Sequence, residues 1–369
     1  MNNKIFISAG DLSGEIHAAN LVREIKKANP SWRIYACGGE NLKAAADEFI
    51  EDIVNINAFG FFPIKQVLFL KKFLKRLLKF FETQKPDKII LVDYYGFHIH
   101  VAKAAKKLGI PVYYYISPQV WASRPARIKK LAATVKKMLV ILPFEEELYK
   151  KAGIDAVFVG NPLIDRVPYT DKSLPSTPPL IGLFPGSRKS VIKRHMPIII
   201  KTAKILRDRL NADFVMFTAN DNFHYELPQY IKIERNNDWE IRKSIDFAVC
   251  PSGTVSLENS LMGIPMAVMY KLSYFNYFIM RMIAKVKYIT IANILADKSI
   301  VPEFIQFDAK PEKIADCVIA GLNKETYAAK VKELSDLRKM LGEKGVSKRA
   351  AAIISGQGDG GIDHFLNLI

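Results

Sequence analysis

Ser252, Gly253 and Thr254 form the pattern with the clearest chemical meaning in this chain. They follow the short apolar run 246–250 and precede residues with helical character. The first amide N–H groups of a helix lack internal acceptors and lie at the positive end of the helix dipole, so they attract phosphate. Two hydroxyl groups, and a glycine that permits close approach, favour the same ligand. The segment predicts a phosphate site, although an ordinary N-capped helix would also contain these residues.

Glu258 and Arg188 extend this prediction. Glu258 lies one helical turn beyond Thr254, where its carboxylate could accept both hydroxyls of a ribose. Arg188 follows another apolar run, and a guanidinium can bind phosphate through two parallel hydrogen bonds. A phosphate site beside a diol acceptor indicates a nucleotide.

Asp93 is the candidate for acid–base chemistry in the first half of the chain. It ends the predicted strand 88–93. A carboxylate at the carboxyl end of a central strand is well placed as a general base, and equally well placed to cap a helix. The loop 10–15 is a glycine turn into a helix, but it lacks the G-x-G-x-x-G spacing, so a dinucleotide site is poorly supported.

Length and composition predict a two-domain globular protein. A chain of 369 residues is too long for one ordinary core, and 49% hydrophobic with 25% charged residues is typical of soluble proteins. The three cysteines show neither a disulfide framework nor zinc-ligand spacing, which indicates a reducing compartment. We find no signal peptide and no apolar run of about 18 residues, the length that a membrane span needs.

The net charge of +17 is unevenly distributed, and no acid occurs between residues 94 and 144. The run 59–81 combines a broad apolar stripe with lysines and arginine on the remaining surface. This pattern is typical of a helix in a membrane interface, although a core helix with a solvated face would show it too. Phe and Leu favour anionic lipid over nucleic acid, which would call for Arg, Asn and Gln. The predicted membrane-binding residues are Ile64, Val67, Leu68, Phe73 and Leu77 with Lys71, Lys72, Lys75 and Arg76.

Apolar runs alternate with amphipathic segments along the chain, which predicts parallel sheets covered by helices on both faces. The expected strands are 4–8, 33–37, 88–93, 112–116, 138–142 and 157–159, then 180–184, 213–217, 232–234, 246–250 and 266–269. We expect domains at 1–165 and 180–345 joined by the proline-rich linker 166–179. A helical segment, 346–369, could cross back to the first domain or pair with another chain, which leaves a homodimer open.

Six motifs, in order, resemble the lipid A disaccharide synthase family. They are GDLSGE, SPQVWASR, GNPLID, LFPGSR, SGTVSLE and VKYITIANILADKSIVPEFIQ, and the resemblance spans residues 4–310. It implies a GT-B-like α/β fold, with two Rossmann-like doubly wound parallel-sheet domains facing across a cleft. It also implies a peripheral enzyme on the cytoplasmic face of the inner membrane. The reaction would join UDP-2,3-diacylglucosamine to 2,3-diacylglucosamine 1-phosphate through a β-1,6 linkage and release UDP.

The resemblance also suggests roles for individual residues. Asp93 would be the base that deprotonates the acceptor 6-hydroxyl in an inverting transfer. The UDP site would comprise Arg188, Ser252, Gly253, Thr254, Glu258, Asn293 and Gln306. The acceptor loops would contribute Ser13, Gly14, Gln119, Trp121 and Arg124. We find no D-x-D motif, so no cofactor or metal is expected.

This chain departs from the family pattern at Gly96 and His98, where a second acid and an asparagine are common, and at Ser123 in the tryptophan motif. These changes bear on the acceptor side. Two other functions remain open. A UDP-sugar epimerase of the same fold has no need of the cationic apolar helix, and a membrane or nucleic-acid binding module without catalysis leaves Asp93 and Glu258 unexplained.

Overall fold

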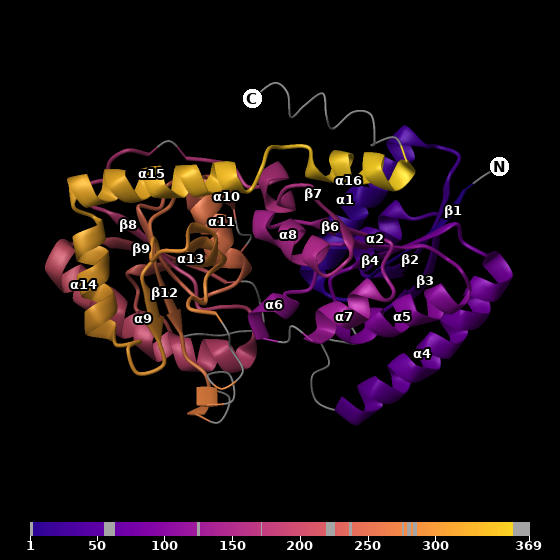
Figure 1. Cartoon of the computed structure of the whole chain (residues 1–369). Coiled ribbons are helices and arrows are strands. Elements are labelled where there is room, and N and C mark those ends of the chain that lie inside the picture. Colours follow the sequence, from indigo (N-terminus) through magenta and orange to yellow (C-terminus); the bar gives the residue numbers. More distant parts are fainter. Residues whose placement is uncertain are drawn as a thin grey trace, which may run out of the picture. The chain divides into compact units, whose positions relative to one another are not determined.

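The computed structural model describes residues 3–54, 63–123, 126–170, 172–218, 226–235, 238–274, 277–278, 282 and 286–356. The chain forms two compact units (Figure 1). The first comprises Met1–Asp165 together with the chain from Glu343 onward, and the second comprises Arg166–Gly342.

The first unit contains seven parallel strands in the order β3-β2-β1-β4-β5-β6-β7. They are β1 (Lys4–Ala9), β2 (Arg33–Gly38), β3 (Glu48–Asp52), β4 (Lys88–Val92), β5 (Val112–Tyr115), β6 (Lys137–Val140) and β7 (Asp155–Phe158). The helices are α1 (Leu12–Ala28), α2 (Glu40–Ala45), α4 (Pro63–Gln84), α5 (Tyr95–Lys107), α6 (Val120–Ser123), α7 (Ala126–Ala132), α8 (Pro143–Lys151) and α16 (Val346–Ser355), with a 3₁₀ turn at Pro162–Asp165.

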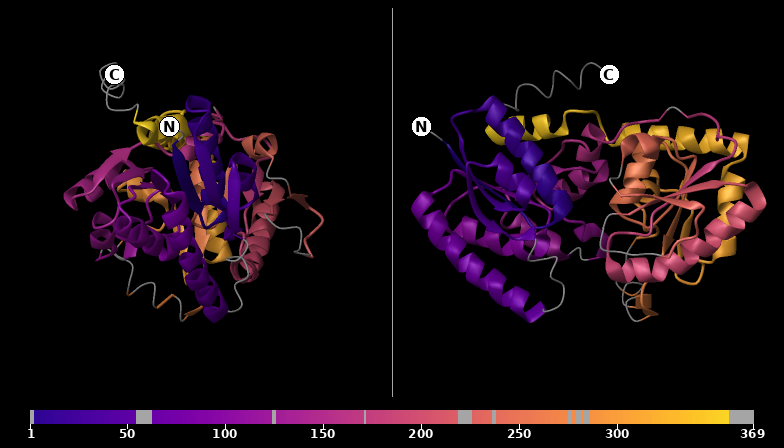
Figure 2. Two further views of the ribbon diagram at one scale, coloured as in Figure 1. Left: turned by 90° about the vertical axis from the view of Figure 1, so that its right-hand side faces the viewer. Right: turned by 180° about the vertical axis from the view of Figure 1, so that it is seen from behind.

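Alternating residues of these strands face two different helical layers. Ile5 and Ile7 belong to the apolar cluster formed with α1 and α16, whereas Phe6 belongs to the cluster formed with α4 and α5. Successive side chains of a strand point to opposite faces, so an apolar run is buried on both. Figures 1 and 2 show α16 and α4 at opposite sides of this sheet.

The C-terminal helix α16 returns to the first unit and packs against α1. Asn29 at the end of α1 donates a hydrogen bond to Ser355 Oγ at 2.9 Å. Lys88 donates to the main-chain oxygen of Ile354, which places an ammonium group at the negative end of the α16 dipole. The helix is therefore part of the first unit's core.

The second unit contains six parallel strands in the order β10-β9-β8-β11-β12-β13. They are β8 (Leu180–Leu183), β9 (Asp213–Phe217), β10 (Ile231–Glu234), β11 (Phe247–Cys250), β12 (Met266–Tyr270) and β13 (Glu303–Ile305). Helices α9 (Lys189–Leu210) and α14 (Pro311–Gly321) share one apolar cluster with the strands. The described residues of this unit also form α10 (Trp239–Lys243), α11 (Thr254–Met262), α13 (Ile291–Ala296) and α15 (Lys324–Met340), and α11 packs against α13 and α15.

The strand orders confirm the predicted doubly wound α/β architecture in both halves. In such sheets the order reverses between the first and the fourth strand, and ligands bind beyond the carboxyl ends at that point. The reversal falls between β1 and β4 in the first unit and between β8 and β11 in the second. Asp93 directly follows β4, and Ser252 and Gly253 closely follow β11, so the candidate residues stand at these two positions.

Two edge strands, β3 and β13, were not predicted from the sequence. None of their residues is fully buried, so neither strand carries the apolar run that marks a central strand. The expected linker 166–179 lies in the second unit. It bonds there to Asp246, the residue before β11, which accepts from the Ser176 amide at 2.9 Å and forms an ion pair with Lys172.

Candidate active site

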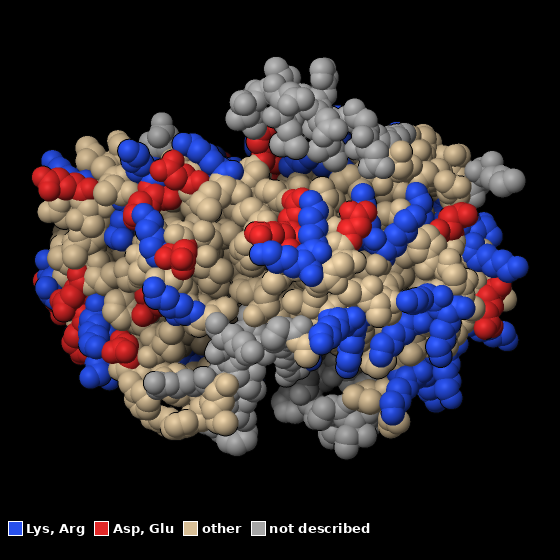
Figure 3. Space-filling model, in the orientation of Figure 1, with Lys and Arg blue, Asp and Glu red and all other residues tan. Residues whose placement is uncertain are grey.

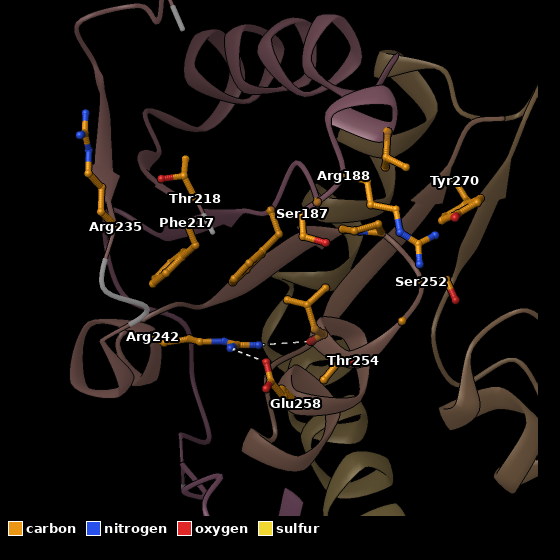
Figure 4. Close-up of a pocket in the computed structure, with 16 residues that line it drawn as sticks. Ser187, Arg188, Phe217, Thr218, Arg235, Arg242, Ser252, Thr254, Glu258 and Tyr270 are labelled. Carbon is orange, nitrogen blue, oxygen red and sulfur yellow. Dashed lines mark hydrogen bonds and ion pairs between the residues drawn. The ribbon is translucent and has the colours of Figure 1, made fainter. Parts of the chain in front are cut away.

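A pocket of about 580 Å³ lies in the second unit, beyond the carboxyl ends of β8 and β11 (Figure 4). Its wall is built from the loops after these two strands and from the ends of β9, β10 and β12. The lining residues are Phe184, Gly186, Ser187, Arg188, Val191, Phe217, Thr218, Arg235, Arg242, Pro251, Ser252, Gly253, Thr254, Val255, Glu258 and Tyr270. Five of the seven predicted UDP-binding residues are among them.

Gly253 is the N-cap of α11 and has φ +136° and ψ −155°, a conformation that side chains do not tolerate. Ser256 Oγ accepts from the Gly253 amide at 3.2 Å and donates to the Gly253 carbonyl at 2.8 Å. Because Ser256 fastens the turn from inside the helix, the first amide groups of α11 face outward beside Thr254. This arrangement has the geometry of a phosphate site.

Ser252 and Arg188 lie near that helix start and line the same pocket. Ser252 Oγ donates to the main-chain oxygen of Ile289 at 2.7 Å, so its hydroxyl also ties the loop to a distant segment. Arg188 is the N-cap residue of α9, after the turn at Gly186 with φ +108°. Figure 4 shows its guanidinium extending toward Ser252 and Tyr270. Cationic and amide donors thus face one pocket.

Glu258 is held by two arginines that the sequence did not indicate. Its Oε1 accepts from Arg166 Nη2 at 2.8 Å and its Oε2 from Arg242 Nη1 at 2.9 Å. Arg242 is completely buried, and its Nε and Nη2 also donate to Asn259 Oδ1. Each carboxylate oxygen can still accept another hydrogen bond, so the arginines fix the group without closing it to a diol. No short-range pattern marks either arginine, because their partner is far away in sequence.

One side of the pocket is aromatic. The rings of Phe184 and Phe217 stack at 4.8 Å with an interplanar angle of 9°. The Arg242 guanidinium lies 5.0 Å from the centre of the Phe184 ring, so a cation covers that ring. Thr218 and Arg235 extend the same wall. A flat, partly apolar surface with polar neighbours suits a planar base.

His195 joins two loops of the pocket. Its Nε2 accepts from the Lys271 amide at 3.1 Å, and its Nδ1 donates to the Pro185 carbonyl at 3.2 Å. The bond from the Lys271 amide requires the neutral ring, because a protonated Nε2 cannot accept. Burial lowers the pKa of His195 to about 4, which the Pro185 bond opposes, so the ring is neutral at physiological pH. His195 thereby fixes the loop that carries Arg188 relative to the end of β12.

Asn293 and Gln306 do not line the pocket, so their place in the UDP site stays a prediction. Asn293 is buried, and its amide bonds to both main-chain groups of Val301 and to Glu303 Oε1. Gln306 is also buried, and its amide bonds to the main chain of Leu272 at 3.1 and 3.3 Å. Their hydrogen-bonding capacity is used to hold the loops around β12 and β13.

Asp93 in the first unit follows β4 in a tight left-handed turn. Both Asp93 and Tyr94 have φ +47°. The Asp93 carbonyl accepts from His98 Nδ1 at 2.8 Å and from the Tyr114 hydroxyl at 2.5 Å. The Tyr94 ring lies against Gly10, where a Cβ would come within 2.1 Å of the ring. These neighbours hold the turn that presents the Asp93 side chain.

The electrostatics of Asp93 fit a general base. Burial and the nearby charge of Asp11 raise its pKa to about 7; a bond from the Tyr94 amide opposes the rise, and the charge of Glu145 adds to it. The N-cap residue of α5 is Tyr94, so Asp93 does not occupy that position. The capping alternative is therefore not supported.

The predicted acceptor loops also lie in the first unit. Ser13 is exposed, and Gly14 is buried with its amide donating to Asp11 Oδ1 at 2.8 Å at the start of α1. Gln119 is exposed, and half-buried Trp121 donates its indole N–H to Glu145 Oε1 at 2.9 Å. Arg124 lies outside the described residues.

Helix α4 divides the predicted membrane-binding residues into two groups. Val67 and Leu68 are 51% and 57% exposed, whereas Phe73 and Leu77 are buried in the core with α5 and the sheet. The prediction that Phe73 and Leu77 contact a membrane is therefore wrong, because the broad stripe includes the face that packs inward. The Ile64 side chain lies outside the described part.

The cations of α4 lie on its outer side. Lys71, Lys72, Lys75 and Arg76 are exposed, and Arg76 also bonds to Glu51 Oε2 at 2.8 Å. Figure 3 shows Lys and Arg gathered at lower right, over the region of α4, α5 and α7 in Figure 1. None of the described helices is long and apolar enough to cross a membrane.

A family model described as lipid-A-disaccharide synthetase matches residues 5–355. Curated relatives named lipid-A-disaccharide synthase include that of Syntrophus aciditrophicus, which is 39% identical over 96% of this chain and 97% of its own length. The protein of Geobacter metallireducens is 36% identical over the same shares. These matches span both units.

Solved structures with a similar fold are more distant in sequence. They include a UDP complex of MnaA from S. aureus, with a TM-score of 0.65, 15% identity, and coverage of 100% of this chain and 98% of that one. MurG from Acinetobacter baumannii has a TM-score of 0.60 and 14% identity, with 96% and 100% covered. These likenesses show that the GT-B fold is shared, and the family and its relatives narrow the assignment. The chain is a glycosyltransferase that belongs to the lipid-A-disaccharide synthase family.

Proposed function

We propose that this enzyme transfers 2,3-diacylglucosamine from its UDP derivative to 2,3-diacylglucosamine 1-phosphate, with release of UDP. The family membership supports a UDP-sugar donor and a lipid acceptor of this type. The observation that carries the donor half is the pocket in which the start of α11, Arg188 and Glu258 meet.

UDP would occupy this pocket with its parts matched to different groups. The diphosphate would bind to the amides at Gly253 and Thr254 and to Arg188. Glu258 would accept hydroxyls of the ribose, since the two arginines hold its carboxylate in place. The aromatic surface of Phe184 and Phe217 would contact the uracil.

Asp93 would take the proton from the acceptor 6-hydroxyl as this oxygen attacks the anomeric carbon, and the bond to UDP would break with inversion. Negative charge then develops on the leaving diphosphate. Arg188 and the α11 amides would stabilise this charge, so the reaction would proceed without a divalent cation. Full activity in excess EDTA is the expected result, and a loss that Mg²⁺ restores would refute this part.

Anionic lipid is the proposed surface on which the enzyme acts, at the cytoplasmic face of the inner membrane. Exposed Val67 and Leu68 together with the cations of α4 support interfacial binding. Both proposed substrates carry acyl chains that remain in a lipid environment, so peripheral attachment would bring the enzyme to them.

An assay with both acylated substrates in detergent tests the function directly. Release of UDP and a disaccharide of the expected mass, each dependent on the acceptor, is the predicted result. Release without acceptor would indicate hydrolysis instead. Incubation with UDP-GlcNAc alone tests the epimerase alternative, which requires an epimer to form.

A further inference from the structure

Glu145 connects the start of α8 to the loop that follows β5. Its side chain is buried, and Oε1 accepts from Ser117 Oγ at 2.6 Å and from Trp121 Nε1 at 2.9 Å. Oε2 accepts from the Leu142 amide at 3.2 Å. One carboxylate thus joins a helix start to both ends of the segment 117–121.

The next turn of α8 holds the middle of the same segment. Tyr149 is fully buried and donates its hydroxyl to the Pro118 carbonyl at 3.1 Å. The Trp121 ring also packs edge-on against Phe144, with ring centres 5.0 Å apart. Between these attachments the exposed Gln119 is presented to solvent. The loop that is predicted to bind the acceptor is therefore held in place by side chains of α8.

The hydrogen bonds of Glu145 do not by themselves explain why a carboxylate is buried at this position. Its hydrogen-bond donors in the described part of the chain are the side chains of Ser117 and Trp121 and the amides of Leu142 and Ile141, all of them neutral. A neutral acceptor could bond to Ser117 and Trp121 without the cost of burying a carboxylate. Burial raises the pKa of Glu145 to about 7, and those hydrogen bonds limit the rise. A group that ionises in this range changes the field around it near neutral pH.

The charge of Glu145 acts on the Asp93 carboxylate. The charge of Glu145 follows burial and Asp11 among the causes that raise the pKa of Asp93. The titratable groups around the two carboxylates include Asp11 at the start of α1, Tyr114 on β5, Tyr149 on α8, and Tyr95 and His98 on α5. Asp11 adds to the negative potential there.

We propose that Glu145 is a positioning residue for the acceptor half of the reaction: it fixes Ser117 and Trp121 in the acceptor loop, and its charge adds to the negative potential at Asp93. This inference rests on the proposed function, in which Asp93 is the base. Its two parts, the hydrogen bonds and the charge, can be separated by substitution.

Glu145→Ala removes both parts, and Glu145→Gln removes the charge but retains an amide oxygen for Ser117 and Trp121. We expect Glu145→Ala to raise the acceptor KM about tenfold with an unchanged Kd for UDP, as expected for the loss of about one charge-assisted hydrogen bond. Glu145→Gln should restore most of the acceptor KM, yet shift the acid limb of kcat/KM to lower pH because Asp93 becomes less basic. Trp121→Phe should raise the acceptor KM and leave the acid limb in place.

Glu147→Gln is the matched control, because Glu147 lies on the same helix with a 75% exposed side chain paired to Lys151. It should match the wild type in KM and pH profile. A wild-type acid limb in Glu145→Gln would overturn the electrostatic role, and a wild-type acceptor KM in both Glu145→Ala and Trp121→Phe would overturn the positioning role. Thermal melting checks folding, and Glu145→Gln with Trp121→Phe suffice if Glu145→Ala does not fold.

Failure of the proposed function would look different. A wild-type enzyme that releases no UDP, or Asp93→Asn at near-normal rate, would contradict the function or the base assignment. Altered Glu145 variants could then not be assigned to the acceptor half. A normal wild type and an inactive Asp93→Asn, combined with unaffected Glu145 variants, would contradict this inference alone.

Discussion

His98 Nδ1 lies 2.8 Å from the main-chain oxygen of Asp93, and on the other side of the ring Nε2 lies 2.9 Å from Ser8 Oγ. A carbonyl oxygen can only accept, so Nδ1 carries the proton and Nε2 accepts from the serine. The neutral histidine thus links the end of β1 to the turn after β4. It fixes the backbone of the proposed base rather than its carboxylate.

His98→Ala should destabilise the protein by about 1 to 3 kcal/mol and lower kcat, because it leaves the buried Ser8 hydroxyl without this partner and weakens the left-handed turn. Thermal denaturation and turnover measure the two effects. His98→Asn retains a side-chain donor and should recover part of both losses. Equal stability of the alanine variant and the wild type would refute the structural role.

The same residue predicts a dependence of stability on pH. Burial lowers the pKa of His98 to about 4, below its ordinary value of 6.5. The unfolded chain therefore binds a proton more readily than the folded chain. The stability that the protein gains from a neutral His98 is therefore complete above pH 6.5 and is lost as pH falls toward 4. Denaturant titrations over that pH window should show that the free energy of unfolding falls less steeply with decreasing pH in His98→Asn than in the wild type.

Asp93 should control the acid limb of the reaction. Its pKa of about 7 means that it is protonated at lower pH, so kcat/KM should fall about tenfold for each unit below this value. Asp93→Asn should lower turnover with little change in UDP affinity, since UDP is proposed to bind the other unit. A pH series with the wild type and calorimetry with the variant provide the check. Near-normal turnover would remove the assignment.

Gly253→Ala should raise the Kd for UDP while the protein still folds. A residue other than glycine at φ +136° is strained, and relief of that strain turns the first α11 amides away from the ligand. We expect at least about a tenfold higher Kd, with Arg188→Ala also weakening UDP. Gly109→Ala, with φ +71° and open space around its Cβ position, is a matched control for strain outside the pocket. Equal effects of the two glycine substitutions on UDP would contradict the site.

Substitution of Arg242 should cost much more folding stability than substitution of Arg166, although both side chains bind Glu258. Arg242 is fully buried, so Arg242→Met would leave Glu258 without one partner and cost about 3 to 5 kcal/mol of folding stability. The Arg166 side chain is 35% exposed, so Arg166→Met should cost about 1 kcal/mol or less. Urea denaturation compares them. Similar losses would show that burial does not determine the strength of this network.

The two groups of apolar residues on α4 give a further test. Val67→Ser with Leu68→Ser should reduce sedimentation with anionic vesicles while leaving thermal stability nearly unchanged, because both side chains are exposed. Phe73→Ser should instead destabilise the fold by about 3 to 5 kcal/mol, as expected for a large residue removed from a core. Vesicle binding that is insensitive to the double substitution would count against the membrane face.

The sequence determined the features that depend on neighbouring residues. Periodic apolar runs located the central strands, and the glycine turn before Thr254 predicted a phosphate site, because a helix start exposes its amides wherever it occurs. Family motifs in both halves were sufficient to identify the chemistry. The edge strands β3 and β13 escaped because partial burial removes the apolar signal on which such a prediction depends.

Tertiary structure decided what each side chain contacts. It placed Phe73 and Leu77 in the core and directed the Asn293 and Gln306 amides to main-chain partners. It also brought Arg242 to Glu258 and Glu145 to Trp121, pairs that are separated by 16 and 24 residues. A helical stripe gives the direction of a side chain only within its own helix, and a hydrogen bond needs its partner within about 3 Å. Both depend on how strands and helices pack, which no local pattern contains.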